Sequence, residues 1–537
     1  MESSNRVNRI ILTIYLSFIL ISQIIAVPNI NLPFLIIESL ALIVIALLVS
    51  PVVIKYFSRF NVHEDQHFCK ISARTLKFIF YGVPFFVLLL YYFAYYPGGF
   101  TNDSLAQFNE YFYSQYGDWH PALHTLFTFT LPLKLTHGWI GSVILFQIIL
   151  FAAALGYGFD SIYKYAGRNY VLGSMIYILF NPLLCICVNP WKDTSFAIGA
   201  LLLMTYALRI YVTKGDWFKK PLNMVLFVVV FVFTTIFRHN AILFTAPLLL
   251  ALLFYISRKR ALCLILAVVA LFAVIKGPLY SAVGVQKESQ RRQIETMGLP
   301  LTVIGAAVTY TPEVLDEDIL EFAYKIAPEQ IWEDYYEMGN INIIKWGTVD
   351  NIDDMVDIDV VDEYESSEII DMMLRCFKAS AYVSLRSLVK LTEGVYTVTD
   401  SHYVEIVPYI DDNYFGIGVP GIGIDNYLGL NKPSTRSNIL TTAFYYHWIM
   451  IKVLFPHVFL FYGVALLLVV ISFCSKLRLG KLKDWKKVLF AVPLLAYNFG
   501  TALLLTGSND CPRYFYYTVL VVPVLLVFFY RKEEKSR

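Results

Sequence analysis

The sequence predicts an all-α polytopic membrane protein, and its composition and the length of its apolar runs predict this class. Of the 537 residues, 57% are hydrophobic and 16% aromatic, and the mean hydropathy is +0.59. Many apolar runs approach twenty residues, which is the length that a helix needs to cross a bilayer. The composition therefore excludes a soluble fold, and nothing in it supports nucleic-acid binding.

About twelve transmembrane helices are expected from these runs. They are centred on residues 10–27, 34–54, 75–95, 139–157, 170–188, 194–213, 221–238, 241–257, 261–280, 447–474, 487–507 and 514–530. The first run follows Arg6 and Arg9 as a signal peptide would, but no small-x-small cleavage site precedes Pro28, so we expect a retained anchor. The 121–135 stretch is too short for a comfortable crossing, and we interpret it as an interfacial or re-entrant helix.

Charge predicts the orientation. Residues 282–440 hold 27 of the 41 acidic residues but 11 of the 43 Lys and Arg. Cytoplasmic loops carry the excess of Lys and Arg, so both termini are expected in the cytoplasm and the acidic loop outside a multi-pass cell-membrane protein. If the 121–135 stretch crossed the membrane, the acidic loop would instead be cytoplasmic.

Four regions follow from this topology. They are an N-terminal transmembrane hairpin with a cytoplasmic loop (1–74), a transmembrane core with a catalytic outer loop at 96–138 (75–281), an acidic extracytoplasmic domain of mixed structure (282–446), and C-terminal transmembrane helices with a basic tail (447–537). Within the acidic domain, we expect Met297–Val308 to dip into the membrane interface and Met372–Leu391 to form an amphipathic helix on the membrane.

Four short segments are expected to meet on the outer face. They are the 96–121 loop, Asn189–Asp193, Arg238–Asn240 and Ser508–Tyr514. In the first, Asp103 follows a span directly and falls in the first turn of a surface helix, where it also suits the helix dipole. A charge beside a span is often only a membrane anchor. Four charged segments on one face favour a functional site.

The charged residues in these segments suit group transfer. Asp103 and Asp193 offer carboxylates for catalysis, and the cations expected to bind substrate are Lys192, Arg238, His239 and Arg513. A carboxylate base beside cations fits transfer from a lipid-linked phosphate donor to a hydroxyl group, because the cations stabilise charge on the departing phosphate. Arginine matches phosphate oxygens with its planar fork.

Asp118 and His120 are further candidates for substrate binding. Asp118 beside Gly117 also suits a plain turn. His120 and His124 have the i, i+4 spacing of two metal ligands on a helix, but no glutamate accompanies them and Pro121 intervenes. Capping and packing are the competing interpretation, and a divalent metal is a possible but uncertain cofactor.

Several motifs together resemble a known superfamily. They are PGGFTNDSLAQF, WHPALHTLF, NPWKDTSFA, FRHNAILF and MGLPLTVIGAA, within a resemblance that covers residues 75–530. They are similar to the GT-C superfamily of integral-membrane glycosyltransferases, and most of all to a bacterial GT-C-like family whose function is not established. The resemblance implies a polyprenyl-phosphate-sugar donor, a cell-envelope glycan, lipid or protein acceptor, and Asp103 as the base. One base with one displacement implies inversion at the anomeric carbon.

The sequence departs from the superfamily at the base and leaves other functions open. Many GT-C enzymes carry an Asp-Asp or Asp-Glu pair in this loop, whereas Asn102 and Ser104 flank Asp103 here. A multi-span transporter or a flippase of lipid-linked saccharides is the alternative, although transporters usually place charges at the bilayer midplane and have two similar halves. A glycan polymerase or ligase needs similar chemistry and is not separated from a single-sugar transferase.

Overall fold

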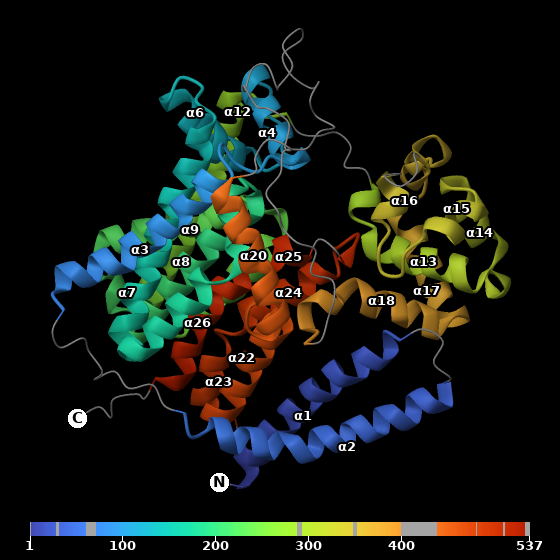
Figure 1. Cartoon of the computed structure of the whole chain (residues 1–537), viewed down its shortest axis with the longest axis horizontal. Helices are drawn as coiled ribbons and strands as arrows, with labels where there is room; N and C mark the ends of the chain where they lie inside the picture. The colour runs from blue at the N-terminus through green and yellow to red at the C-terminus, as the bar shows by residue number, and fades with distance from the viewer. Residues whose placement is uncertain are drawn as a thin grey trace.

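The computed structural model describes residues 2–27, 32–60, 71–286, 293–346, 352–398, 438–479, 481–508 and 511–531. Over these ranges the fold is helical, and the extended backbone is limited to isolated bridges (Figure 1). Seven helices are long and apolar enough to cross a membrane, as expected of a membrane protein. The other apolar helices are shorter, so the count of twelve spans stays a prediction.

The helices of the membrane region follow the predicted runs closely. They are α1 Glu2–Ile25, α2 Leu32–Phe57, α3 Ala73–Ala94, α7 Gly141–Leu179, α8 Lys192–Val212, α9 Pro221–Ile236, α10 Ile242–Leu253, α11 Arg258–Val274, α12 Tyr280–Val283, α20 Ile439–Leu454, α22 Tyr462–Lys476, α23 Leu482–Val488, α24 Val492–Ala502 and α26 Tyr517–Tyr530. The expected 447–474 span is divided, because the chain leaves the helix around Pro456 between α20 and α22.

The expected spans 139–157 and 170–188 are joined in one helical element, α7, within which the chain reverses direction. The 39 residues of α7 would extend about 58 Å if straight. However, Gly167 within α7 has φ 78°, a backbone angle that glycine adopts readily. Beyond α7, the 3₁₀ helix η2 (Pro182–Val188) brings the chain back, because the Gln147 amide donates to the carbonyls of Cys187 at 2.8 Å and Asn189 at 3.0 Å. The two arms therefore run antiparallel.

The bundle has two chemically different ends. At one end, the Asn8 side chain donates to the carbonyls of Cys474 and Leu477, and the Arg531 guanidinium lies over the Tyr165 ring. The basic loops flank these residues in the sequence. At the opposite end of α22, the Tyr462 hydroxyl donates to the Pro512 carbonyl at 2.6 Å. That end carries the predicted functional segments.

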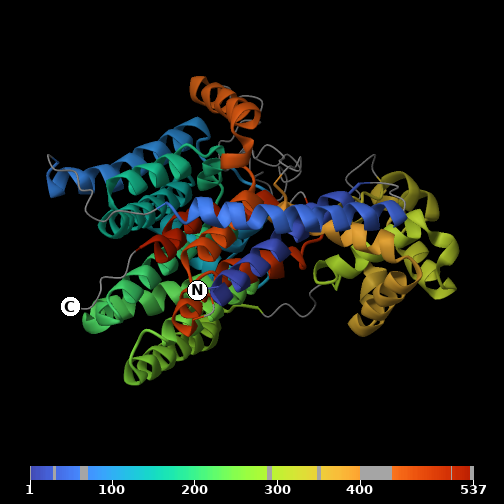
Figure 2. The ribbon, with the colours of Figure 1, turned by 90° about the horizontal axis from the view of Figure 1, so that it is seen from below.

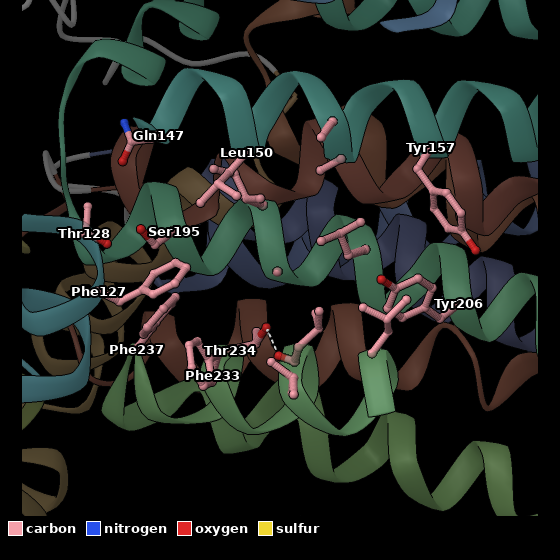
Figure 3. A pocket seen from close by; sticks show the side chains of 18 of the residues that line it. Phe127, Thr128, Gln147, Leu150, Tyr157, Ser195, Tyr206, Phe233, Thr234 and Phe237 are labelled. Atoms are coloured by element: carbon pink, nitrogen blue, oxygen red, sulfur yellow. Dashed lines mark hydrogen bonds between the residues drawn. The ribbon is translucent and has the colours of Figure 1, made fainter. Parts of the chain in front are cut away.

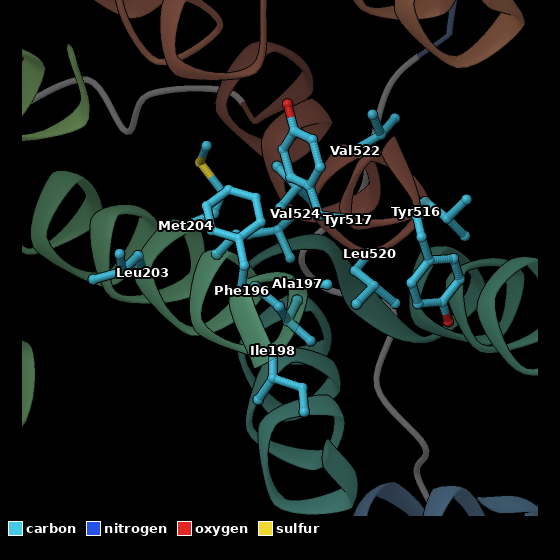
Figure 4. Packing of buried hydrophobic residues seen from close by; sticks show 14 of the residues in the cluster. Phe196, Ala197, Ile198, Leu203, Met204, Tyr516, Tyr517, Leu520, Val522 and Val524 are labelled. Atoms are coloured by element: carbon cyan, nitrogen blue, oxygen red, sulfur yellow. The ribbon is translucent and has the colours of Figure 1, made fainter. Parts of the chain in front are cut away.

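The centre of the bundle is formed by α8 and α26. Figure 4 shows Phe196 and Met204 of α8 interleaved with Tyr517 and Leu520 of α26. The Phe196 and Tyr517 rings meet at 5.3 Å between centroids, and these side chains are almost fully buried. Between membrane helices, close packing of this kind supplies most of the association energy. The N-termini of both helices are thereby fixed beside each other.

A separate helical body lies to one side of the bundle (Figures 1 and 2). It contains α13 Gly298–Tyr310, α14 Glu317–Ile326, α15 Glu329–Tyr335, α16 Asn342–Trp346 and α17 Ser366–Ala379, which enclose their own hydrophobic core. The next helix, α18 (Ala381–Tyr396), connects this core to the bundle and to the α1–α2 hairpin, where the Tyr382 hydroxyl donates to the Val27 carbonyl.

Two expectations for this body are wrong. Met297–Val308 is not placed to dip into a membrane, because α13 is the buried central helix of the separate core, packed against Trp332 and Tyr336. Met372–Leu391 is not one helix, because it divides at Ser380 into α17, which faces that core, and α18. In both cases an internal core produced an apolar pattern that sequence reasoning attributed to lipid.

Candidate functional site

The site is built on the starts of two helices. Asp103 lies in the first turn of α4 (Asn102–Tyr113), and Asp193 lies in the first turn of α8. Free backbone N–H groups and the helix dipole stabilise a carboxylate at both positions. Trp191 joins these starts, since its indole N–H donates to Thr101 Oγ1 at 2.8 Å.

Two arginines connect these carboxylates. Arg238 precedes the short helix η4 (His239–Ala241) between α9 and α10, and Arg513 lies in α25 (Cys511–Phe515). Arg513 Nη2 is 3.3 Å from Asp103 Oδ2, and its Nε is 3.8 Å from Asp193 Oδ2. Arg238 Nη1 forms an ion pair with Asp193 Oδ1. The expectation that the four segments meet is confirmed by these contacts.

These four residues together with Lys192 are called the charge cluster below. Lys192 is the first residue of α8, and no hydrogen bond or ion pair joins its ammonium group to another described residue. Among the described residues the cluster therefore has three cations and two carboxylates. Asn509 and Asp510, from the same predicted segment as Arg513, lie outside the described residues.

The two ion pairs differ in access to solvent. The side chains of Asp193 and Arg238 are 1% and 8% exposed, whereas those of Asp103 and Arg513 are 27% and 21% exposed. A buried pair needs both partners, because removal of one leaves a charge without compensation. Only the Asp103–Arg513 pair is open to an incoming ligand.

Aromatic rings hold the arginines in place. The Arg238 guanidinium lies 4.2 Å from the Tyr514 ring centroid and 5.8 Å from that of Tyr497. Arg513 lies 4.7 Å from the Tyr514 ring centroid and 5.4 Å from that of Trp191. Cations are attracted to ring faces, so these contacts fix the direction of both guanidinium groups. The sequence reasoning missed the rings, although Trp191 and Tyr514 are direct neighbours of Lys192 and Arg513.

The protonation states follow from these neighbours. Burial raises the pKa of Asp103, but Arg513, Lys192 and further cations outweigh that effect and hold it below its ordinary range. Burial, reinforced by Lys192, lowers the pKa of His120 to about 4. At neutral pH, Asp103 is therefore a carboxylate that can accept a proton, and His120 is neutral.

The other predicted site residues hold the first outer loop together. Asp118 Oδ2 is 2.7 Å from Lys276 Nζ, and Asp118 Oδ1 accepts a hydrogen bond from the Ala122 N–H. His239 Nε2 lies 3.2 Å and 3.3 Å from the carbonyl oxygens of Asp118 and Trp119. These contacts give Asp118 and His239 a structural part, whereas their binding of substrate stays a prediction.

His124, the second histidine of the pair, has the geometry of packing. His124 Nδ1 accepts from Gln107 at 2.8 Å, and its Nε2 lies 3.0 Å from Ser195 Oγ. Both ring nitrogens are thus occupied, which joins the first outer loop to α8. In the described part of the chain, no three His, Cys, Asp or Glu side chains are grouped closely enough to hold a metal ion. The divalent metal remains an untested expectation.

The structure contains an apolar cavity of about 640 Å³ (Figure 3). It lies between α7, α8 and α9, and the sequence reasoning did not anticipate it. Ser195 and Phe237 line it at one end, two residues from Asp193 and one residue from Arg238. Tyr206 lines it at the other end, eleven residues further along α8, which is about 16 Å. The cavity is long enough for part of a lipid chain.

The fold and the site define an α-helical membrane protein with a charge cluster at the end of an apolar cavity. No protein-family model, no curated protein and no solved structure matches the chain. The resemblance to the GT-C superfamily therefore remains an argument from the motifs and their geometry.

Proposed function

We propose that the protein is a GT-C-type glycosyltransferase that moves a sugar from a polyprenyl-phosphate donor to a cell-envelope hydroxyl group on the outer face. One observation carries the proposal: Ser195 and Phe237, which line one end of the apolar cavity, lie two residues from Asp193 and one residue from Arg238 in a cluster with an excess of cations. A lipid phosphate has the matching shape, with a long apolar chain and an anionic head. A charge cluster inside a membrane protein generally marks a functional site.

The proposal includes the twelve-span topology with both termini in the cytoplasm and residues 282–446 outside. The segregation of the bundle ends supports it, because the basic loops flank one end and the charge cluster occupies the other. On this topology, the donor chain lies in the outer leaflet. Its phosphate reaches the outer surface beside Asp103.

The phosphate is held by Lys192 and Arg513. Lys192 lies within the electrostatic reach of Asp103 but forms no direct ion pair with another described residue, and Arg513 belongs to the accessible ion pair. Arg238 does not contact the phosphate, because it already forms the buried ion pair with Asp193. Its contribution to phosphate binding is limited to its positive electrostatic potential. As Arg513 turns toward the phosphate, Asp103 loses its strongest cationic neighbour, and its pKa rises toward that of a better base.

Transfer is a single displacement at the anomeric carbon. The acceptor oxygen forms a bond to that carbon while the bond from the carbon to the phosphate oxygen breaks, and the bonding electrons leave with the lipid phosphate. The acceptor proton passes to Asp103, and Lys192 and Arg513 stabilise the departing charge. Attack from the face opposite the phosphate inverts the configuration.

Donor binding tests the proposal. The purified protein in nanodiscs is incubated with a short-chain polyprenyl phosphate, and the retained lipid is measured by native mass spectrometry. We expect retention that falls about tenfold in Arg513→Ala, while Arg375→Ala, a surface arginine of the separate body, serves as a control without effect. Equal retention of a neutral polyprenol and the phosphate would contradict the proposal.

The cavity also fits the alternative of a flippase for lipid-linked saccharides. A flippase needs the cavity and the cations but no base. Reconstituted vesicles distinguish the two functions: movement of an intact fluorescent lipid-linked sugar between leaflets, without loss of the sugar and without dependence on Asp103, favours the flippase.

A further inference from the structure

A second pocket opens along the same face of α4 that begins at Asp103. Its volume is about 340 Å³, and it is lined by Ala106, Asn109, Glu110, Tyr113, Gln115, Trp119 and His120. Asp103, Ala106, Glu110 and Tyr113 follow one another at helical spacing, so they share one face of the helix. His120, in the loop that follows α4, lines the pocket as well.

Two buried polar atoms of this pocket have no hydrogen-bond partner in the described part of the chain. They are Asn109 Oδ1 and His120 Nδ1. The His120 side chain is 7% exposed. Buried polar groups are almost always hydrogen-bonded, and those that are not indicate a missing ligand or water. The pocket therefore offers one acceptor and one ring nitrogen to a molecule that carries hydroxyl groups.

Aromatic rings complete the pocket. Tyr113 is 42% exposed at its rim, and Trp119 is partly buried beside His120. An aromatic face packs well on the C–H face of a sugar ring, while the polar groups bind its hydroxyls. A lipid chain fits this lining poorly, because the side chains of Glu110 and Gln115 would lose contact with water.

We propose that this pocket binds a sugar ring of a carbohydrate acceptor, and we call it the acceptor pocket. Its role in transfer rests on the proposed function, whereas sugar binding itself does not. The pocket extends to Tyr113, ten residues and about 15 Å along α4 from Asp103. A single donor sugar attached to a phosphate at Arg513 does not extend that far. The lipid donor and the acceptor thus approach the charge cluster from different sides.

Sugar binding is tested by saturation-transfer difference NMR on the full chain in nanodiscs. The probes are the methyl glycosides of glucose, galactose, mannose, N-acetylglucosamine and N-acetylgalactosamine. We expect saturation transfer to at least one of them, reduced at least fivefold in both Trp119→Leu and Asn109→Ala. Trp139→Leu is the control, because Trp139 is an exposed tryptophan that donates to the Tyr96 hydroxyl outside the pocket.

Three results overturn the acceptor pocket. They are no saturation transfer to any glycoside, equal saturation-transfer signals in Trp119→Leu and the control, and saturation transfer to a Ser/Thr-rich peptide in place of the glycosides. If glycosides bind as expected but the wild-type protein transfers no sugar from a polyprenyl-phosphate-sugar donor, the pocket is retained and the proposed glycosyl transfer fails. If the protein transfers sugar to a carbohydrate acceptor, the KM for that acceptor should rise about tenfold in Trp119→Leu with little change in kcat, because a binding contact has been removed.

Discussion

The two ion pairs of the charge cluster use the same chemistry in different surroundings. Asp193 and Arg238 are almost completely buried, whereas Asp103 and Arg513 keep about a quarter of their side chains exposed. The buried pair fixes the N-terminus of α8 against the turn between α9 and α10. The accessible pair joins the start of α4 to α25.

This difference in burial distinguishes the pair that supports the fold from the pair that we propose to take part in the reaction. A base must reach the acceptor proton, and a phosphate ligand must be able to leave its internal partner. Asp103 and Arg513 satisfy both conditions, whereas Asp193 and Arg238 satisfy neither. The position of a charged residue beside a span therefore does not reveal its role, but its burial and its partner do.

Breaking the buried pair has the largest expected effect on stability. Arg238→Ala leaves the buried Asp193 carboxylate with only the longer 3.8 Å contact to Arg513, at a cost that approaches about 3–5 kcal/mol. Arg513→Ala should cost much less, because its pair is partly solvated. Thermal unfolding of the detergent-solubilised variants measures both. If Arg238→Ala unfolds at the same temperature as Arg513→Ala, the two pairs are equivalent and the comparison is wrong.

Acid should weaken the fold through His120. Its pKa is about 4 in the folded protein and about 6.5 when unfolded, so its contribution to stability is complete above pH 6.5 and is lost as the pH falls toward 4. Between pH 7 and 5 the loss is about 2 kcal/mol. Asp103 adds nothing in this window, because its lowered pKa matters only at lower pH.

Thermal unfolding between pH 7 and 5 tests this prediction. His120→Gln should remove about half of the dependence on pH, because burial also lowers the pKa of His124, to about 3, and that ring contributes similarly. The exposed His137→Gln should leave the dependence unchanged. The same slope in His120→Gln and wild type would show that His120 is not the group responsible.

Filling the apolar cavity should affect the donor alone. Ala153 lines the cavity, so a tryptophan at 153 competes with the lipid chain, and we expect the donor KM to rise about tenfold, equivalent to about 1.4 kcal/mol. The control is Ala270→Trp, at an exposed position of α11 outside the cavity. Steady-state kinetics with a polyprenyl-phosphate sugar measures both. An unchanged KM in Ala153→Trp would place the lipid chain elsewhere.

The smallest effect is expected for a conservative change in the accessible pair. Arg513→Lys keeps the charge but loses the planar fork, so donor affinity should fall about threefold to fivefold, near 1 kcal/mol. Native mass spectrometry with the polyprenyl phosphate measures it. A loss as large as that of Arg513→Ala would mean that the lysine does not reach the phosphate at all.

The sequence predicted much of the fold because apolar runs and Lys/Arg placement are strong signals in membrane proteins. It placed Asp103, Asp193, Arg238 and Arg513 on one face, and the structure joins them by ion pairs. It did not predict which carboxylate is buried. That property depends on how α9, α10 and α25 pack around α8, which no local pattern encodes.

The remaining errors also have a physical cause. Helices that face a protein core and helices that face lipid share the same periodicity, so α13 and α17 were assigned to the membrane surface. The aromatic rings around the arginines and the apolar cavity come from residues far apart in the chain. The spacing of His120 and His124 resembled a metal motif. The structure instead shows the His124 ring packed between Gln107 and Ser195.

The central claim is that Asp103 is the base and Asp193 is a supporting residue. Asp103→Asn keeps the shape and the position at the helix start but cannot take a proton at neutral pH. The measurement is sugar transfer from a radiolabelled polyprenyl-phosphate donor by purified Asp103→Asn and Asp193→Asn, each normalised to folded, donor-binding protein. We expect turnover by Asp103→Asn to fall about 10²–10⁴-fold, and the folded fraction of Asp193→Asn to keep most of its turnover. Near-wild-type turnover in Asp103→Asn, with collapse in Asp193→Asn, would contradict the account.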